Sequence, residues 1–142
     1  MTGVQTCALP ISFRREVPAL NKLYEQYKDR AAFYIVYIQE AHSSDVWQME
    51  SNVKQHIVIA SPRSADERAA VADSCVRNLH IAIPALMDDF QNTTEQAYTG
   101  WPDRLYAIDR GGRVAYKSGP GPFGFHPKEL ETALARLVSG AR

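Results

Sequence analysis

The residues best suited to chemistry lie directly after a short apolar run at residues 33–38. Glu40 and His42 are two positions apart, so an extended backbone would point both side chains to one face. A carboxylate beside an imidazole can select the imidazole tautomer and raise its pKa, which suits a proton donor near neutral pH. Tyr37 could extend that hydrogen-bond chain. We interpret Tyr37, Glu40 and His42 as candidate proton-handling groups; the alternative is that Glu40 and His42 only satisfy backbone groups at a strand end.

The run that precedes these residues has no polar face and contains three β-branched side chains. Such a run is typical of a strand that is buried on both faces of a parallel sheet. In open α/β sheets, ligands bind outside the carboxyl ends of the strands. We therefore expect the functional site at the carboxyl end of this strand.

The other secondary-structure elements are predicted from the spacing of apolar residues and from capping, turn and proline residues. Helical spacing predicts a first helix over residues 12–27, with a kink at Pro18 or a start near Glu16. A capping box, Ser64 with Glu67, begins a second helix that ends near residue 79. Further predicted elements are a buried strand over 81–87, weakened by Pro84, a short helix over 94–98, a hairpin of 104–108 and 113–117, and a last helix from Pro127.

Composition excludes several classes of function. The chain has 142 residues, 16 basic and 16 acidic side chains and a pI near 6.9, so nothing indicates a nucleic-acid partner. No apolar run approaches the roughly 20 residues that cross a bilayer. Cys7 and Cys75 are too few for a disulfide framework or a structural zinc site, so a reducing, cytoplasmic setting is favoured. We predict no metal site and no cofactor, since the spacing of His56, His80 and His126 suggests no metal ligands.

The first eleven residues, MTGVQTCALPI, resemble the translation of a common short-read sequencing adapter. We expect residues 1–11 to be an artefact and residues 12–142 to be an N-terminally truncated domain. Cys7 would then be an accident of the adapter, and the original N-terminus, with any signal peptide, would be missing. The alternative is a genuine N-terminus.

Five segments carry a resemblance to a known family: FRREVPAL, YIQEAHSSDVW, PRSADER, IPALMDDFQN and AYTGWPDRLYAIDRGGRVAYKSGPGP. From about residue 13 to residue 137 the chain resembles a bacterial-type member of the iodothyronine deiodinase-like family of the thioredoxin superfamily. The resemblance implies an α/β, thioredoxin-like fold with a mixed sheet of about four strands flanked by helices, whose first strand is missing or replaced. It also implies a cis-proline loop at Trp101-Pro102 beside the active thiol. We predict Trp101, Pro102 and Arg104 as substrate-binding residues; the alternative for Arg104 is that it pairs with Asp103 or faces solvent.

The family's nucleophile, a selenocysteine or cysteine, lies in a Thr-Cys-Pro-Pro-Phe-like segment at the start of the first helix. Residues 9–13 align with that segment, and only Phe13 fits. Cys7 lies too far upstream to align without a gap, and Cys75 has the helical spacing of a core side chain rather than a resolving cysteine. We expect the chain as written to lack its nucleophile and to be inactive.

The resemblance predicts a thiol-dependent oxidoreductase that acts on a peroxide, a disulfide or a halogenated aromatic and takes electrons from an external thiol. The alternative is a non-catalytic thioredoxin-fold module that binds a partner through the same cleft. Hormone-acting members have a histidine and a basic residue where Pro62 and Pro120 stand here, so thyroid-hormone deiodination is not predicted. A fragment without its first strand would expose a sheet edge and could associate, and the oligomeric state stays open.

Overall fold

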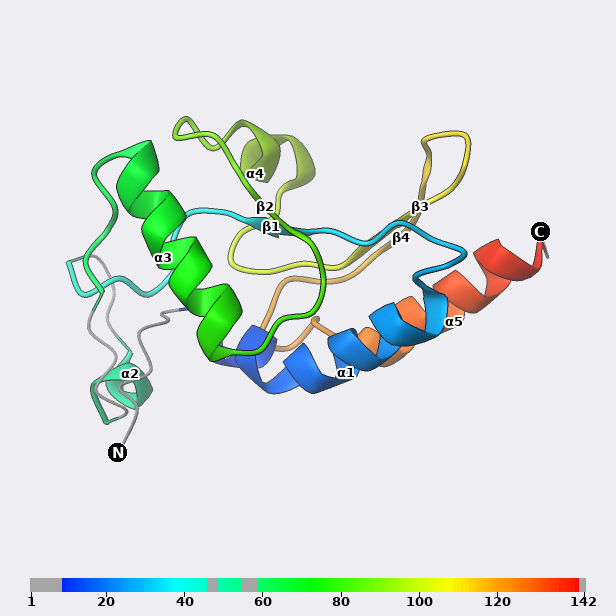
Figure 1. The fold of residues 1–142 in the computed structure, drawn as a ribbon, viewed down its shortest axis with the longest axis horizontal. Coiled ribbons are helices and arrows are strands. Elements are labelled where there is room, and N and C mark those ends of the chain that lie inside the picture. Colours follow the sequence, from blue (N-terminus) through cyan, green and yellow to red (C-terminus); the bar gives the residue numbers. More distant parts are fainter. Residues whose placement is uncertain (1–8, 46–48, 55–58, 141–142) are drawn as a thin grey trace.

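The computed structural model describes residues 9–45, 49–54 and 59–140 (Figure 1). Its elements in chain order are α1 (Ile11–Tyr27), β1 (Ile35–Tyr37), α2 (Glu50–Lys54), α3 (Ala65–Asn78), β2 (Ala85–Met87), α4 (Thr93–Tyr98), β3 (Tyr106–Ile108), β4 (Val114–Lys117) and α5 (Pro127–Ser139). Cys7, Trp47 and His56 lie outside the described residues.

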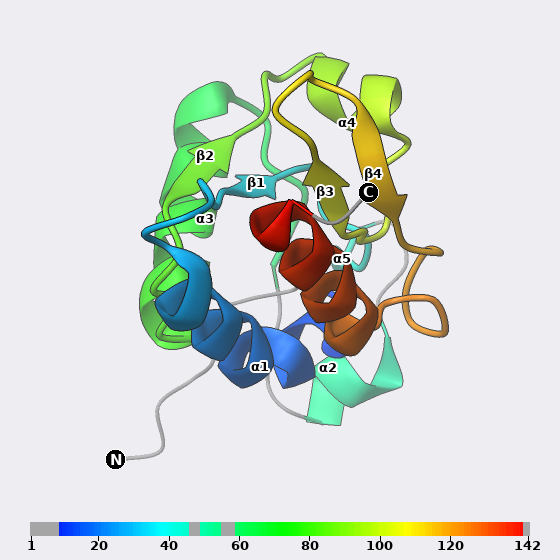
Figure 2. The same ribbon diagram turned by 90° about the vertical axis from the view of Figure 1, so that its right-hand side faces the viewer.

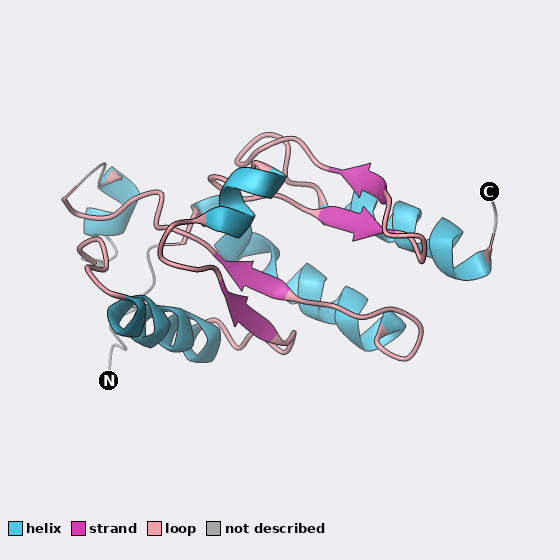
Figure 3. Cartoon of the chain, turned by 90° about the horizontal axis from the view of Figure 1, so that it is seen from above, coloured by secondary structure: helices cyan, strands magenta, loops and turns pink. Residues whose placement is uncertain are grey.

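Helices lie on both sides of the strands. The helices α1 and α5 pack against each other below the strands in Figure 1, and α4 lies on the opposite side, as the turned view in Figure 2 also shows. Strand β1 pairs with β2 in parallel, and β3 pairs with β4 antiparallel. The described strands thus form two two-stranded sheets, seen edge to edge from above in Figure 3. This mixed α/β arrangement is compatible with a thioredoxin-like fold, and a single four-stranded sheet is not confirmed.

Helix α1 begins at Ile11 and continues through Pro18, so the alternative start near Glu16 is wrong. The helix is held by an apolar stripe at helical spacing, which outweighs the backbone hydrogen bond that proline cannot donate. The buried members of that stripe are Phe13, Val17, Leu20, Leu23 and Tyr27.

The prediction of a strand buried on both faces is wrong for β1. Ile35 packs into the core beside α1 and α5, and Tyr37 is buried in a second cluster with Cys75. Val36 points to the other face, where its side chain is 38% exposed. The apolar character of Val36 alone was therefore not enough to predict its burial.

The second predicted strand is shorter and more exposed than expected. Only Ala85–Met87 forms β2, and all three residues are exposed. Pro84 cannot donate to the ladder, but its carbonyl accepts a hydrogen bond from the Ile35 N–H at 2.9 Å. The prediction of a buried strand over 81–87 is therefore wrong in extent and burial, although Ile81 and Ile83 are buried in the loop before it.

The starts of two helices and the hairpin turn agree with the predictions from the sequence. The Ser64 hydroxyl accepts the Glu67 N–H at 3.1 Å at the start of α3, and Pro127 is the first residue of α5. In the hairpin turn, Gly112 has a φ of 77°, a conformation that glycine adopts without strain.

The main core lies between the strands and the pair α1 and α5. Its buried side chains include Phe13, Leu20, Ile83, Ala107, Phe125, Leu130 and Leu134. Cys75 is 1% exposed, as its spacing predicted, but it is disulfide-bonded and so is not the core thiol that was expected. Within the described residues, no helix combines the length and apolar character needed to cross a bilayer.

Candidate functional site

Asp103 joins the loop before β3 to the start of α1. It follows Trp101-Pro102, whose peptide bond is cis, and its side chain is buried. The Ser12 hydroxyl, in the first turn of α1, donates a hydrogen bond of 2.6 Å to Asp103 Oδ2. The carboxyl group therefore lies at the N-terminal end of α1, although residues 12 and 103 are 91 positions apart in the sequence.

Gly121 closes the other side of this carboxyl group. Its N–H donates a hydrogen bond of 3.2 Å to the backbone carbonyl of Asp103. A Cβ atom at position 121 would lie 1.8 Å from Asp103 Oδ1, which no side chain could tolerate without displacing the loop. Glycine is needed here because the backbone approaches the carboxyl group so closely.

His42 interacts electrostatically with Asp103. Burial raises the pKa of Asp103, and the Ser12 hydrogen bond, the backbone N–H groups of Gly121 and Phe13, and the charge of His42 act in the opposite direction. Asp103 therefore holds a proton more readily than an ordinary aspartate. A carboxyl group and an imidazole that interact at a helix N-terminus can exchange protons with a group bound there.

Glu40 is influenced by the charges of two arginines. Both of its carboxylate oxygens are buried without a hydrogen-bond partner in the described part of the chain. Burial raises the pKa of Glu40 to about 7, against Arg14 on α1 and Arg68 on α3, which lower it. A group with this pKa can give up or accept a proton near neutral pH.

The two arginines are held by contacts of their own. Arg14 Nη2 donates to Asn52 Oδ1 at 2.8 Å, and Arg68 Nη1 donates to the Asp89 carbonyl at 2.6 Å. The Arg68 guanidinium also lies over the Phe90 ring, 5.0 Å from its centroid. These contacts hold the two positive charges that act on the buried Glu40 carboxyl group.

The predicted partnership of Glu40 with His42 differs from the observed one. No hydrogen bond joins these two side chains among the described residues, whereas the charge of His42 acts on the carboxyl group of Asp103. The Tyr37 hydroxyl is buried and, over the same residues, has no hydrogen-bond partner, so it does not extend the chain of bonds.

The loop residues are more peripheral. Trp101 is 40% exposed, and Pro102 is half-buried beside Asp103. Arg104 Nη1 donates to the Ser118 carbonyl at 3.2 Å, which ties this side chain to the loop after β4. The Asp88-Asp89 pair follows the end of β2, and the Asp88 carboxylate accepts the N–H groups of Thr94 and Glu95.

Sequence reasoning missed Asp103, Ser12, Arg14 and Arg68. The available signal for Asp103 was its position directly after the predicted cis-proline. Arg14, in the first turns of α1, is half-buried, and burial lowers its pKa. Nothing in the local sequence distinguishes Arg68 from the other arginines, because its role depends on packing between α3 and β1.

Comparison of the sequence with known proteins identifies the family of the chain. The sequence profile described as iodothyronine deiodinase matches residues 2–138. The chain belongs to the iodothyronine deiodinase family. The resemblance drawn from the segments around residues 37–47 is thereby confirmed, and the matched range includes most of the residues attributed above to an adapter.

Individual relatives agree with this membership. The chain is 31% identical to a type I iodothyronine deiodinase from Xenopus laevis, over 92% of this chain and 49% of that protein. It is 32% identical to a human thyroxine 5-deiodinase, over 96% of this chain and 44% of the relative. A type II iodothyronine deiodinase from Rattus norvegicus is 28% identical, over 89% and 48% respectively. The chain thus spans about half the length of the curated relatives it matches.

Proposed function

We propose that the parent protein is a thiol-dependent oxidoreductase of the deiodinase family whose site is the N-terminal end of α1. The observation that carries this proposal is the 2.6 Å hydrogen bond from Ser12 to Asp103, together with the interaction of Asp103 with His42. A helix N-terminus stabilises a thiolate, and the thiolate is the reactive form of a thiol. The start of α1 therefore offers both the electrostatics for a thiolate and nearby groups that carry protons.

The proposed reaction is a reduction in which the nucleophile at the start of α1 attacks a disulfide, a peroxide or a halogenated aromatic. With a disulfide, a mixed disulfide forms and the leaving sulfur takes a proton from His42, whose charge Asp103 balances. An external thiol then breaks the mixed disulfide and restores the nucleophile. Glu40, with a pKa of about 7, is proposed as the proton reserve. Trp101, Pro102 and Arg104 are proposed to line the substrate side, and Tyr37 to pack beneath it.

We also propose that the chain as written lacks its nucleophile. Pro10, at the N-cap of α1, stands where the family's nucleophile aligns, and it has no thiol. Residues 1–11 are proposed to derive from a sequencing adapter, which would account for the proline. Comparison of the opening codons with a fresh amplification product from genomic DNA tests this directly: genomic codons for MTGVQTCALPI would overturn it and return Cys7 to consideration.

The four strands are proposed to belong to one mixed, thioredoxin-like sheet that an upstream strand of the parent protein completes. Support comes from β1 and β3, which lie next to each other in Figure 2 while each pairs on one side only among the described residues. A longer parent chain should then protect the Val36 amide from hydrogen exchange. An unprotected amide in the longer chain would contradict this arrangement.

The functional test is to restore a thiol with Pro10→Cys and to measure turnover with dithiothreitol as reductant. The substrates are hydrogen peroxide, a small aromatic disulfide and an iodinated phenol. We expect Pro10→Cys to turn over at least one of these substrates faster than the unsubstituted chain does. Adding His42→Gln to Pro10→Cys should lower that turnover by about tenfold or more. Arg113→Gln, in the exposed hairpin, is the matched control and should leave turnover unchanged. Failure of all three substrates would contradict the proposal.

A second candidate is a non-catalytic binding module, which Pro10 at the N-cap favours only where residues 1–11 are genuine. It predicts that the genuine upstream sequence has no thiol at this position and that Glu40→Ala leaves partner binding intact. Thyroxine is the substrate in the names of several relatives. We do not propose it here, because Pro120 stands where hormone-acting members have a basic residue.

A further inference from the structure

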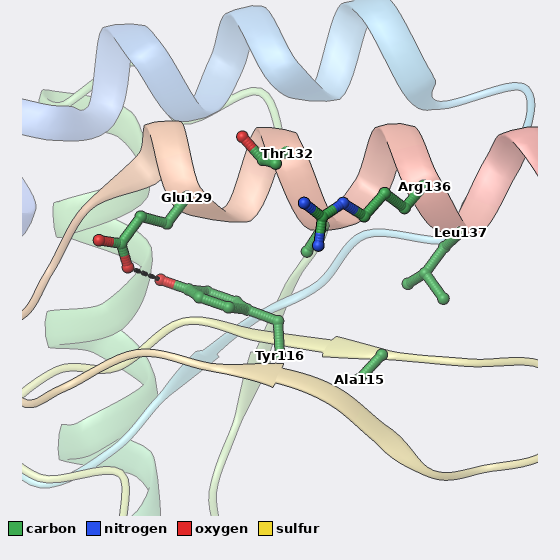
Figure 4. A pocket seen from close by; sticks show the side chains of 7 residues that line it. Ala115, Tyr116, Glu129, Thr132, Arg136 and Leu137 are labelled. Carbon is green, nitrogen blue, oxygen red and sulfur yellow. Dashed lines mark hydrogen bonds between the residues drawn. The ribbon is translucent and has the colours of Figure 1, made fainter. Parts of the chain in front are cut away.

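A cavity of about 400 Å³ lies between β4 and α5, and it shares no residue with the site around Asp103. Ala115 and Tyr116 line it from β4, and the remaining lining residues come from α5 (Figure 4): Glu129, Thr132, Ala133, Arg136 and Leu137. Small-molecule sites are typically cavities of about 300–1,000 Å³ with mostly apolar walls and a few polar groups. This cavity is within that range of size and composition.

The apolar walls suit a flat or aliphatic body. Ala115, Ala133 and Leu137 contribute only carbon atoms. The Tyr116 ring forms the wall on the strand side, and the Arg136 side chain reaches over the same space from the helix side (Figure 4). A ligand placed here would contact the tyrosine ring on one side and the aliphatic stem of the arginine on the other.

The charges of the cavity are distributed unevenly. At one end, the Tyr116 hydroxyl donates to Glu129 Oε2 at 3.0 Å. Burial and Glu129 raise the pKa of Tyr116 to about 12, so this hydroxyl keeps its proton and the bond persists at neutral pH. The Arg136 guanidinium, in contrast, has no hydrogen bond or ion pair within the residues that the structure describes.

We propose that this cavity binds a small organic anion with an apolar or aromatic body and a single anionic group. The anionic group would pair with Arg136, and the body would lie against Tyr116 and Leu137. Glu129 would repel a second anionic group at the far end, so the cavity prefers a monoanion to a dianion. This inference is independent of the redox proposal, because no residue of the cavity belongs to that site.

The test uses 8-anilinonaphthalene-1-sulfonate, which has one sulfonate on an aromatic body. Binding is followed by its fluorescence and located by amide chemical-shift changes in the full chain. We expect saturable 1:1 binding with shifts centred on Tyr116, Ala133 and Leu137. Arg136→Gln should weaken it by about fivefold, as loss of an exposed ion pair would. Arg113→Gln, an exposed arginine on the hairpin, is the matched control and should bind as the original chain does.

Two further measurements separate this cavity from general apolar binding. Ala115→Leu fills the cavity from an exposed strand position, so it should abolish binding while the amide spectrum stays folded. N-phenyl-1-naphthylamine, which has a similar body without the sulfonate, should bind more weakly and be indifferent to Arg136→Gln. Shifts centred elsewhere, unchanged affinity in Arg136→Gln, or unchanged affinity in Ala115→Leu would each overturn the proposal.

Discussion

Ser12 and Asp103 are joined by a hydrogen bond of 2.6 Å that ties the first turn of α1 to the loop before β3. The two residues are 91 positions apart in the sequence, and the bond positions a buried carboxyl group at a helix N-terminus. The same carboxyl group interacts with His42 and contacts the backbone at Gly121. The stability of this junction and the acidity of its groups can be measured separately.

Removing the Ser12 hydroxyl should weaken the junction. Ser12→Ala leaves Asp103 Oδ2 buried without its partner, so we expect the free energy of unfolding to fall by roughly 1–3 kcal/mol. Chemical denaturation at pH 7 measures the change. Ser139→Ala removes an exposed hydroxyl that donates to the Arg136 carbonyl, and this control should have an effect below about 0.5 kcal/mol. If Ser12→Ala and Ser139→Ala lower the free energy of unfolding equally, the hydrogen bond from Ser12 to Asp103 contributes no more to stability than an exposed one.

A side chain at position 121 should be poorly tolerated. In Gly121→Ala the new methyl group would meet Asp103 Oδ1 at 1.8 Å, so the loop must shift, at a cost of roughly 1–3 kcal/mol in unfolding free energy. At Gly100 a Cβ would be 3.6 Å from its nearest neighbour, an ordinary contact, so Gly100→Ala serves as the control. Thermal and chemical unfolding of the pair measure the difference. If Gly121→Ala is as stable as Gly100→Ala, the close approach of the Gly121 backbone to Asp103 Oδ1 is wrong.

Glu40 should make stability depend on pH. Its folded pKa of about 7 lies above the ordinary value of 4.5, so the folded state binds the proton more tightly than the unfolded state. The stabilisation is complete below about pH 4.5 and is lost as the pH rises toward 7, by roughly 3 kcal/mol. Glu40→Gln should lack this fall. The measured quantity is the difference in unfolding free energy between the two proteins from pH 4 to 8.

The exposed Glu50→Gln provides the control for Glu40, and it should follow the original pH curve. A Glu40→Gln curve parallel to the original one at every pH would contradict the buried, neutral carboxyl group.

Arg68 should influence the same carboxyl group from α3. Because the Arg68 charge lowers the pKa of Glu40, Arg68→Gln should move the protonation midpoint of Glu40 above its present value of about 7. Carbon-13 chemical shifts of the Glu40 carboxyl group measure the midpoint. Arg77→Gln, in which an exposed arginine on the same helix is replaced, should leave it unchanged. A midpoint that falls in Arg68→Gln would exclude this cation as a neighbour of Glu40.

Local signals in the sequence predicted the elements well where one residue decides the conformation. The Ser64 cap, Gly112 in the hairpin turn and Pro127 at the start of α5 act over a few residues, and the structure agrees with them. Burial was predicted less well. Val36 and Leu86 have the apolar character of buried strand residues, but their side chains are 38% and 51% exposed, since burial depends on how helices far away in the sequence pack against the strands.

The site residues were predicted only where a local pattern in the sequence marks them. Glu40 and His42 were found because they follow an apolar run, a local pattern. Asp103 and Arg68 were not found, because their relation to the site depends on contacts between segments more than 20 residues apart. The carboxyl group near His42 was therefore assigned to Glu40 from its place in the sequence, whereas the fold also brings Asp103 within electrostatic reach of His42.

The central claim, that the start of α1 is built to hold a reactive thiolate, is tested most directly by the acidity of a thiol placed there. The measurement is the rate of iodoacetamide alkylation against pH for Pro10→Cys, with the modified peptide identified by mass spectrometry. Ser139→Cys, at the exposed C-terminal end of α5, is the control and should titrate near or above the ordinary value of about 8.5. The account predicts a midpoint clearly below about 8.5 for the thiol at position 10, and a midpoint at or above that value would contradict it.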